Sequence, residues 1–179
     1  MKKTLLLGLI IFVSINNIKA DNTAYSNEIQ DTFFGVKFGA SKEEVKAAFL
    51  YRGFEITSDG LDDMLVEHDE NIRFGGYPWE FMMVTFVNNR FKSINFVITL
   101  DRNPKLKLTT EEEAGIFMTI LSDLSKKYNM SILDMEDKDV ITYRAESKQK
   151  YVALSWLVEK KMIILYYTDN TLGDNLDQF

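Results

Sequence analysis

The sequence predicts an α+β fold made of two tandem helix-plus-antiparallel-meander repeats, with the helices on one face of an antiparallel sheet. Two segments begin with helix-capping patterns, two others have the alternation of β-hairpins, and corresponding features recur after 69 or 70 residues. Helices that cover one face of an antiparallel sheet are typical of α+β domains.

The first helix is expected to begin at Ser41 and to end before Gly53. Ser41 and Glu44 form a capping box, in which each side chain satisfies the backbone N–H of the other residue. A glycine such as Gly53 commonly follows the last turn. Gly35 and Gly39 do not form a phosphate-binding loop, because they are separated by three residues instead of four and the Ser–Lys order is reversed.

The second helix is expected to begin at Thr110, where Glu113 completes a second capping box. The acidic run 111–113 complements the positive end of the helix dipole. Apolar residues then follow at helical spacing: Phe117, Leu121, Leu124 and Tyr128.

Two hairpins are expected at 79–100 and 151–168. Asn88 and Asn89 suit a two-residue type I′ turn in the first, and the second turns near Glu159 and Lys160. The segments 81–86 and 162–167 are apolar on both faces. They are either central strands covered by helices or strands with one exposed apolar face, which would mark a binding sheet.

The spacing of these features predicts a tandem duplication. The offset is 69 residues between the helix caps, 69 between short strands expected at 71–74 and 140–143, and 70 between the hairpins. A shared period of this kind indicates repeated units. We therefore expect a first repeat at 33–103, a second at 104–170 and a frayed tail at 171–179.

Residues 1–20 have the features of a signal peptide: Lys2 and Lys3, an apolar run, and Ala20 before the expected cleavage site. The apolar run is shorter than the roughly 20 residues of a membrane span, so an uncleaved anchor is the less favoured reading. The chain has no cysteine, which excludes a lipid anchor of the bacterial lipoprotein type. We expect a periplasmic or secreted protein.

The expected mature chain is acidic. Without Lys2, Lys3 and Lys19, 18 Lys and Arg stand against 27 Asp and Glu, a net charge of −9. This charge argues against nucleic acid or an anionic membrane as a partner and favours a basic protein surface. The absence of cysteine also excludes disulfides and thiol chemistry. We expect a monomer without a cofactor.

The segment "GASKEEV" (39–45), followed by a helix and a meander, resembles the SmpA/OmlA superfamily, which includes the outer-membrane assembly lipoprotein. In tandem, the unit is similar to the β-lactamase inhibitor protein (BLIP-like) fold, in which two repeats form one concave sheet. The resemblance implies a non-catalytic binding module. The chain departs from it in lacking the lipobox cysteine, the inhibitor's disulfides and a Gly-x-Pro after the helix.

Two features could carry ion or acid–base chemistry. His68 is the only histidine, so a hydrolase would have to use it together with nearby carboxylates. Asp59, Asp62 and Asp63 are weak calcium candidates, because their spacing does not fit a calcium-binding loop. A solvated acidic loop over 58–70 is the preferred interpretation.

The segment "RFGGYPWEF" (73–81) is the candidate partner-binding site. Its Gly-Gly turn would present Tyr77, with Pro78 and Trp79 beside it. Tyr and Trp are frequent anchors of protein interfaces. The alternative is that Trp79 begins a strand and closes the core.

These observations favour an exported, non-catalytic protein- or peptide-binding module of the bacterial envelope, for which an inhibitor-like action is one form. The first alternative is a structural factor in outer-membrane or envelope assembly. The second is a hydrolase that uses His68.

Overall fold

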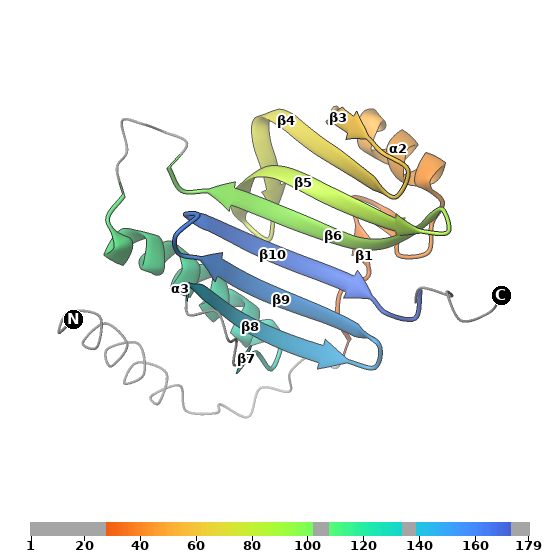
Figure 1. Ribbon diagram of the computed structural model, residues 1–179. Coiled ribbons are helices and arrows are strands. Elements are labelled where there is room, and N and C mark those ends of the chain that lie inside the picture. The colour runs from red at the N-terminus through yellow and green to blue at the C-terminus, as the bar shows by residue number, and fades with distance from the viewer. Residues whose placement is uncertain (1–27, 102–107, 134–138, 173–179) are drawn as a thin grey trace.

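The computed structural model describes residues 28–101, 108–133 and 139–172. The expected signal peptide and most of the expected tail lie outside these residues. The described chain forms an α+β structure with two α-helices and an eight-stranded antiparallel sheet (Figure 1). The predicted fold class is therefore confirmed at this level.

The eight strands of the main sheet follow the order β3-β4-β5-β6-β10-β9-β8-β7. Their bounds are β3 Glu55–Asp59, β4 Asp63–Phe74, β5 Tyr77–Val87, β6 Arg90–Thr99, β7 Ser131–Leu133, β8 Val140–Ser147, β9 Lys150–Leu157 and β10 Met162–Asp169. Two short strands, β1 (Thr32–Phe33) and β2 (Val36–Lys37), pair with each other separately. Helix α2 precedes β3–β6 in the chain, and α3 precedes β7–β10.

Helix α2 (Lys42–Tyr51) forms as predicted from its cap. The Ser41 N–H donates to the Glu44 carboxylate at 2.8 Å, and the Glu44 N–H donates to the Ser41 hydroxyl at 3.4 Å. Gly53, with φ +79°, follows the last turn in the left-handed conformation. Val45 and Phe49 face the core.

Helix α3 (Thr110–Lys127) begins one residue earlier than predicted. The N-cap is Thr109, and its partner in the capping box is Glu112. The T-x-x-E pattern fits both registers in this Thr–Thr–Glu–Glu–Glu run, so the sequence alone could not choose between them. In the structure Glu113 is instead buried, with its carboxylate 3.2 Å from Lys161 Nζ. The cap-to-cap offset becomes 68 residues, from Ser41 to Thr109.

The acidic segment 58–70, expected as a loop, is mostly strand. β4 begins at Asp63 and pairs with β3 and β5, so the short strand predicted at 71–74 is only its last part. Met64 and Val66 point into the core, whereas Asp63, Leu65 and Glu67 point to the other face, and this alternation explains the strand. Each helix is consequently followed by four strands of the sheet, not three.

The predicted turns are confirmed. Asn88 and Asn89 have φ of 51° and 60°, as a type I′ turn requires, and join β5 to β6. Residues 158–161 join β9 to β10. A third hairpin, between β4 and β5, turns through Gly75 and Gly76, which also have positive φ.

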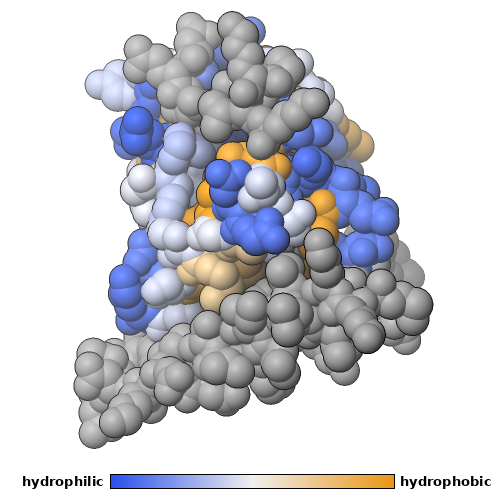
Figure 2. All heavy atoms as spheres, turned by 90° about the vertical axis from the view of Figure 1, so that its left-hand side faces the viewer, coloured by the Kyte–Doolittle hydropathy of each residue, from blue (hydrophilic) through white to orange (hydrophobic). Residues whose placement is uncertain are grey.

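The core lies between the sheet and the helices, which are on the same side of the sheet (Figure 1). It is rich in aromatic rings: Phe74 stacks on Phe96 at 4.1 Å between centroids, and Phe33 from β1 reaches Tyr167 of β10 at 5.0 Å. On α3, Phe117 packs against Trp156 of β9. The side of the molecule on the left of Figure 1 shows hydrophobic residues in the middle of a mostly hydrophilic surface (Figure 2).

β6 and β10 pair at the centre of the sheet and join its two halves. Seven residue pairs align antiparallel, from Ser93 with Thr168 to Thr99 with Met162. Two strands that are distant in the sequence thus make one continuous surface.

Candidate functional site

The candidate site is the face of the sheet opposite the helices, which we call the open face. Successive side chains of a strand point to opposite faces. In β10, Ile163, Leu165 and Tyr167 are buried against the helices, so the alternate residues point to the open face. Its larger side chains are Leu65, Phe81, Met83, Val97, Tyr151, Leu157, Met162, Ile164 and Tyr166.

The strand register places one row of the open face directly across five strands. Met83 of β5 lies opposite Asn95 of β6, which lies opposite Tyr166 of β10. The row continues through Ala153 of β9 to Arg144 of β8. Residues opposite each other on antiparallel strands have Cβ atoms about 5 Å apart, so this row is a continuous strip.

Two tyrosines and an arginine form a cluster on this face. The rings of Tyr151 and Tyr166 have centroids 5.4 Å apart. The Arg144 guanidinium lies 5.1 Å from the centroid of Tyr151, and its Nη2 is 2.6 Å from the Glu146 carboxylate. Burial, followed by the hydrogen bond with Tyr166, raises the pKa of Tyr151 to about 12, so its hydroxyl is protonated at neutral pH.

The open face combines exposed apolar area with polar groups, several of which are paired with each other. Met83 is 39% exposed, and Phe81, Ile164 and both clustered tyrosines are half-buried. On the same face, the hydroxyls of Thr142 and Ser155 bond each other at 2.8 Å. Tyr and Arg are the residue types most often found at the energetic centre of protein interfaces. Such a surface suits the binding of a macromolecule through apolar contact.

Of the three residues predicted to bind a partner, Trp79 lies in the core and Tyr77 contacts α3. Trp79 is fully buried and donates from its indole Nε1 to the Phe74 carbonyl at 2.9 Å. The expectation that it anchors a partner is corrected, and it closes the core instead. The Tyr77 hydroxyl donates to the Asp123 carboxylate at 2.5 Å, while Pro78 alone is exposed.

The predicted calcium candidates are not brought together around an ion. Asp59 is bound by Lys42 Nζ at 2.7 Å and Lys46 Nζ at 2.6 Å, while Asp62 and Asp63 are exposed. Within the ranges that the structure describes, no group of three His, Asp or Glu residues could hold a metal.

His68 lies in β4, and its ring makes an edge-on contact with Phe54, with centroids 5.6 Å apart. This packing gives the histidine a structural role against Phe54, the residue directly before β3.

The open-face cluster was not found from the sequence. The alternation of Tyr151, Ala153 and Ser155 with buried Val152 and Leu154 was the available signal, but both sets contain apolar residues. Only the position of the helices shows which set is exposed.

Neither helix of the described chain has the length and hydrophobicity needed to cross a membrane. No protein-family model matches the chain, and no curated protein or solved structure is similar enough to match it.

Proposed function

We propose that the protein is an exported, non-catalytic module that binds a protein or peptide through the open face. The observation that carries this proposal is the Tyr151–Tyr166–Arg144 cluster, set among half-buried apolar residues on a face that the helices leave uncovered.

The composition of this face supports a macromolecular partner. Aromatic rings bury a large area at a small loss of conformational entropy, because they have few rotatable bonds. The strip from Met83 to Arg144 crosses five strands that lie about 4.8 Å apart, a width of about 19 Å. That width is suited to a segment of folded protein or an extended peptide.

The charge of the chain supports a partner that carries basic side chains beside apolar ones. The expected mature chain has a net charge of −9, and Glu67 and Glu146 lie at opposite sides of the open face. Basic residues around an apolar centre would therefore be attracted during encounter.

The tandem organisation is part of the same proposal. The order of elements supports it, because each helix precedes four consecutive strands and the two sets meet at β6 and β10. This arrangement is consistent with the BLIP-like resemblance, in which two units share one sheet. Export is supported by the sequence of residues 1–20.

The test is a capture experiment with the mature chain, residues 21–179, against envelope and culture-fluid extracts. The variant Tyr151→Ala/Tyr166→Ala removes the cluster. The matched control is Tyr51→Ala, since Tyr51 is 90% exposed on α2, away from the open face. Circular dichroism and thermal unfolding would first establish that all three proteins are folded.

We expect a protein that the wild type and Tyr51→Ala retain and that the double variant loses. The affinity of the purified pair should then fall at least tenfold in the double variant, as interface-centre residues typically cost more than about 1.4 kcal/mol. Equal retention by all three proteins would refute the open face as the site.

A further inference from the structure

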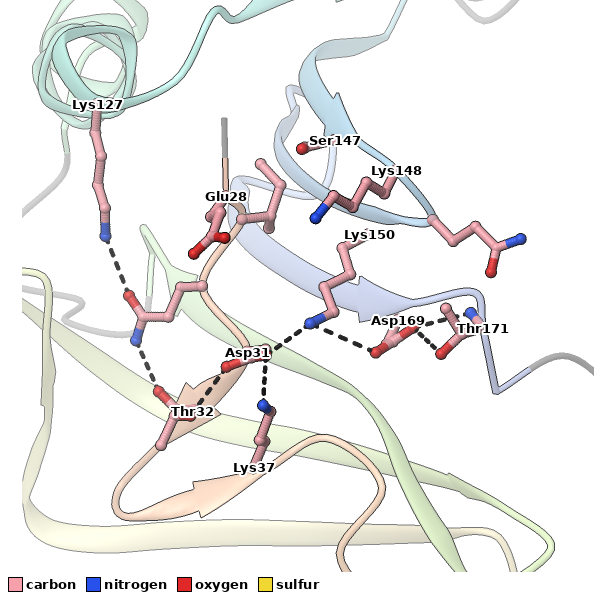
Figure 3. A pocket seen from close by; sticks show the side chains of 13 residues that line it. Glu28, Asp31, Thr32, Lys37, Lys127, Ser147, Lys148, Lys150, Asp169 and Thr171 are labelled. Carbon is pink, nitrogen blue, oxygen red and sulfur yellow. Dashed lines mark hydrogen bonds and ion pairs between the residues drawn. The ribbon is translucent and has the colours of Figure 1, made fainter. Parts of the chain in front are cut away.

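A second candidate site lies on the helix side of the sheet, where the chain before β1 passes the ends of α3 and the β8–β9 hairpin. A polar cavity of about 740 Å³ is found there. Four lysines line it: Lys37, Lys127, Lys148 and Lys150. They come from β2, α3, the β8–β9 turn and β9 (Figure 3). This is a concentration of positive charge in a chain that is acidic as a whole.

Two carboxylates that line this cavity already form ion pairs or hydrogen bonds with neighbouring residues. The Asp31 carboxylate lies 2.6 Å from Lys150 Nζ and 3.4 Å from Lys37 Nζ. Burial alone would raise the pKa of Asp31, but the hydrogen bonds from Lys150 and Thr32 lower it by more, so the pKa is below its usual value. Asp169 accepts hydrogen bonds from the N–H and hydroxyl of Thr171.

Lys127 and Lys148 also line the cavity, from the last turn of α3 and from the β8–β9 turn. The Lys127 ammonium makes one long hydrogen bond, 3.3 Å to the Gln30 side chain. Figure 3 shows the carboxylate of Glu28 between Lys127 and Lys148. In this view a carboxylate of the protein itself stands between the two lysine side chains.

An apolar cavity of about 200 Å³ adjoins the polar one. Its apolar walls lie between the β4–β5 hairpin, α3 and β10, and are made by Phe74, Ile120, Leu124, Leu165 and Tyr167. The hydrogen-bonded pair Tyr77–Asp123 also lines this cavity. Both cavities are lined by Gln30 and Lys127, so the lysine-rich space and the apolar space meet at this contact. At about 30 Å³ for a water-sized group, the apolar cavity has room for about six or seven such groups.

We propose that the two cavities form one site for an amphipathic anion, with its charged group at Lys127 and Lys148 and a short alkyl chain in the apolar cavity. An ammonium group is a strong donor to carboxylate or phosphate oxygens, and the apolar walls favour a chain that leaves water. The ligand displaces Glu28 from between the lysines and replaces the long Lys127–Gln30 hydrogen bond. This site is independent of the open face.

The position of Glu28 allows a test that distinguishes a site specific for anions from a surface that binds any amphiphile. A ligand carboxylate between the two lysines would be repelled by the Glu28 carboxylate, whereas a ligand ammonium would be attracted by it. Neutralising Glu28 and neutralising Lys127 must therefore change anion affinity in opposite directions.

The experiment is isothermal titration calorimetry of the mature chain, residues 21–179, with octanoate. Acetate tests the charged group alone, and octylamine tests the chain with the opposite charge. The variants are Lys127→Gln, Glu28→Gln and the cavity-filling Leu124→Trp. Their controls are Lys160→Gln and Glu111→Gln, which change an exposed charge that lines neither cavity.

We expect octanoate to bind and acetate and octylamine to bind at least about tenfold more weakly. Lys127→Gln should weaken octanoate binding about threefold to fivefold, the range of an exposed ion pair, and Glu28→Gln should strengthen it by a similar factor. Leu124→Trp should weaken it further. The two control variants should bind like the wild type.

Three results would overturn the proposal: no octanoate binding at millimolar concentration, equal binding of octanoate and octylamine, or equal effects of the pocket and control variants. Sedimentation with phosphatidylglycerol vesicles identifies the source of the ligand. Vesicle binding that Lys127→Gln weakens would indicate a membrane lipid, and octanoate binding without vesicle binding would indicate a free amphiphile. The Tyr151→Ala/Tyr166→Ala variant should bind octanoate normally.

Discussion

The Tyr77 hydroxyl donates a 2.5 Å hydrogen bond to the Asp123 carboxylate, which ties the β4–β5 hairpin to α3. Lys126 binds the other oxygen of Asp123 at 2.6 Å. Residues 46 positions apart in the chain are thereby joined on the helix side of the sheet. The contact explains why the segment predicted to reach a partner instead holds two parts of the fold together.

Tyr77→Phe removes this hydrogen bond and leaves the ring in place. We expect the free energy of unfolding to fall by about 1 kcal/mol, the lower part of the range for a bond to a charged group, because the pair is exposed to water. Urea denaturation would measure it, with Tyr51→Phe as the control. An unchanged midpoint for Tyr77→Phe would show that the contact does not contribute to stability.

Alkaline pH should weaken the fold through two tyrosines. Burial, aided by the hydrogen bond to Asp123, raises the pKa of Tyr77 from 10.0 to about 12, and the pKa of Tyr151 is raised to a similar value. The folded state holds these protons more tightly, so their contribution is complete below pH 10 and is lost as the pH rises through about 12. Urea midpoints of Tyr77→Phe/Tyr151→Phe should depend less steeply on pH in this window than those of the wild type. Parallel curves would contradict the assignment.

Acidic pH should lower the stability of the fold through the protonation of Asp59. Hydrogen bonds from Lys42 and then Lys46 lower its pKa from 3.8 to about 2. A lowered folded-state pKa gives stability that is present above the unfolded value and is lost as the pH falls from about 4 to about 2. Asp59→Asn should flatten the pH dependence of unfolding in this window. Asp62→Asn, in the turn that follows β3, is the control, and identical profiles for the two variants would refute the prediction.

Trp79→Ala should be strongly destabilising. The side chain is fully buried, and truncation of a buried Trp costs about 3–5 kcal/mol through lost contacts and the cavity left behind. Ile132→Ala, at a position 62% exposed, should change stability by less than about 0.5 kcal/mol. Guanidinium denaturation compares them. Similar losses for both would mean that Trp79 is not a core residue.

The sequence predicted those elements whose formation depends only on neighbouring residues, such as helix caps and tight turns. The cap at Ser41 and the Asn88–Asn89 turn are set by neighbouring residues, and both form as expected. The predicted start of α3 was wrong by one residue, because the repeated Thr and Glu residues allow two capping boxes. β4 was missed because its acidic outward residues hid the inward Met64 and Val66.

The site depends on long-range pairing and could not be predicted in the same way. Nothing local in 93–99 or 162–168 specifies that β6 pairs with β10. Without that pairing, the proximity of Met83 to Tyr166 has no signature in the sequence. Tyr77 and Trp79 were selected for their residue types, but burial depends on how the hairpin packs against the core.

The β6–β10 pairing also sets when the fold can be completed during synthesis. β10 is the last strand of the sheet, so the backbone groups of β6 that it covers stay unpaired until Asp169 has been made. An unpaired edge is a template for association with other chains. A nascent chain that stalls before Met162 would expose this edge in the middle of its future sheet. Premature release should therefore produce aggregates, not a smaller folded protein.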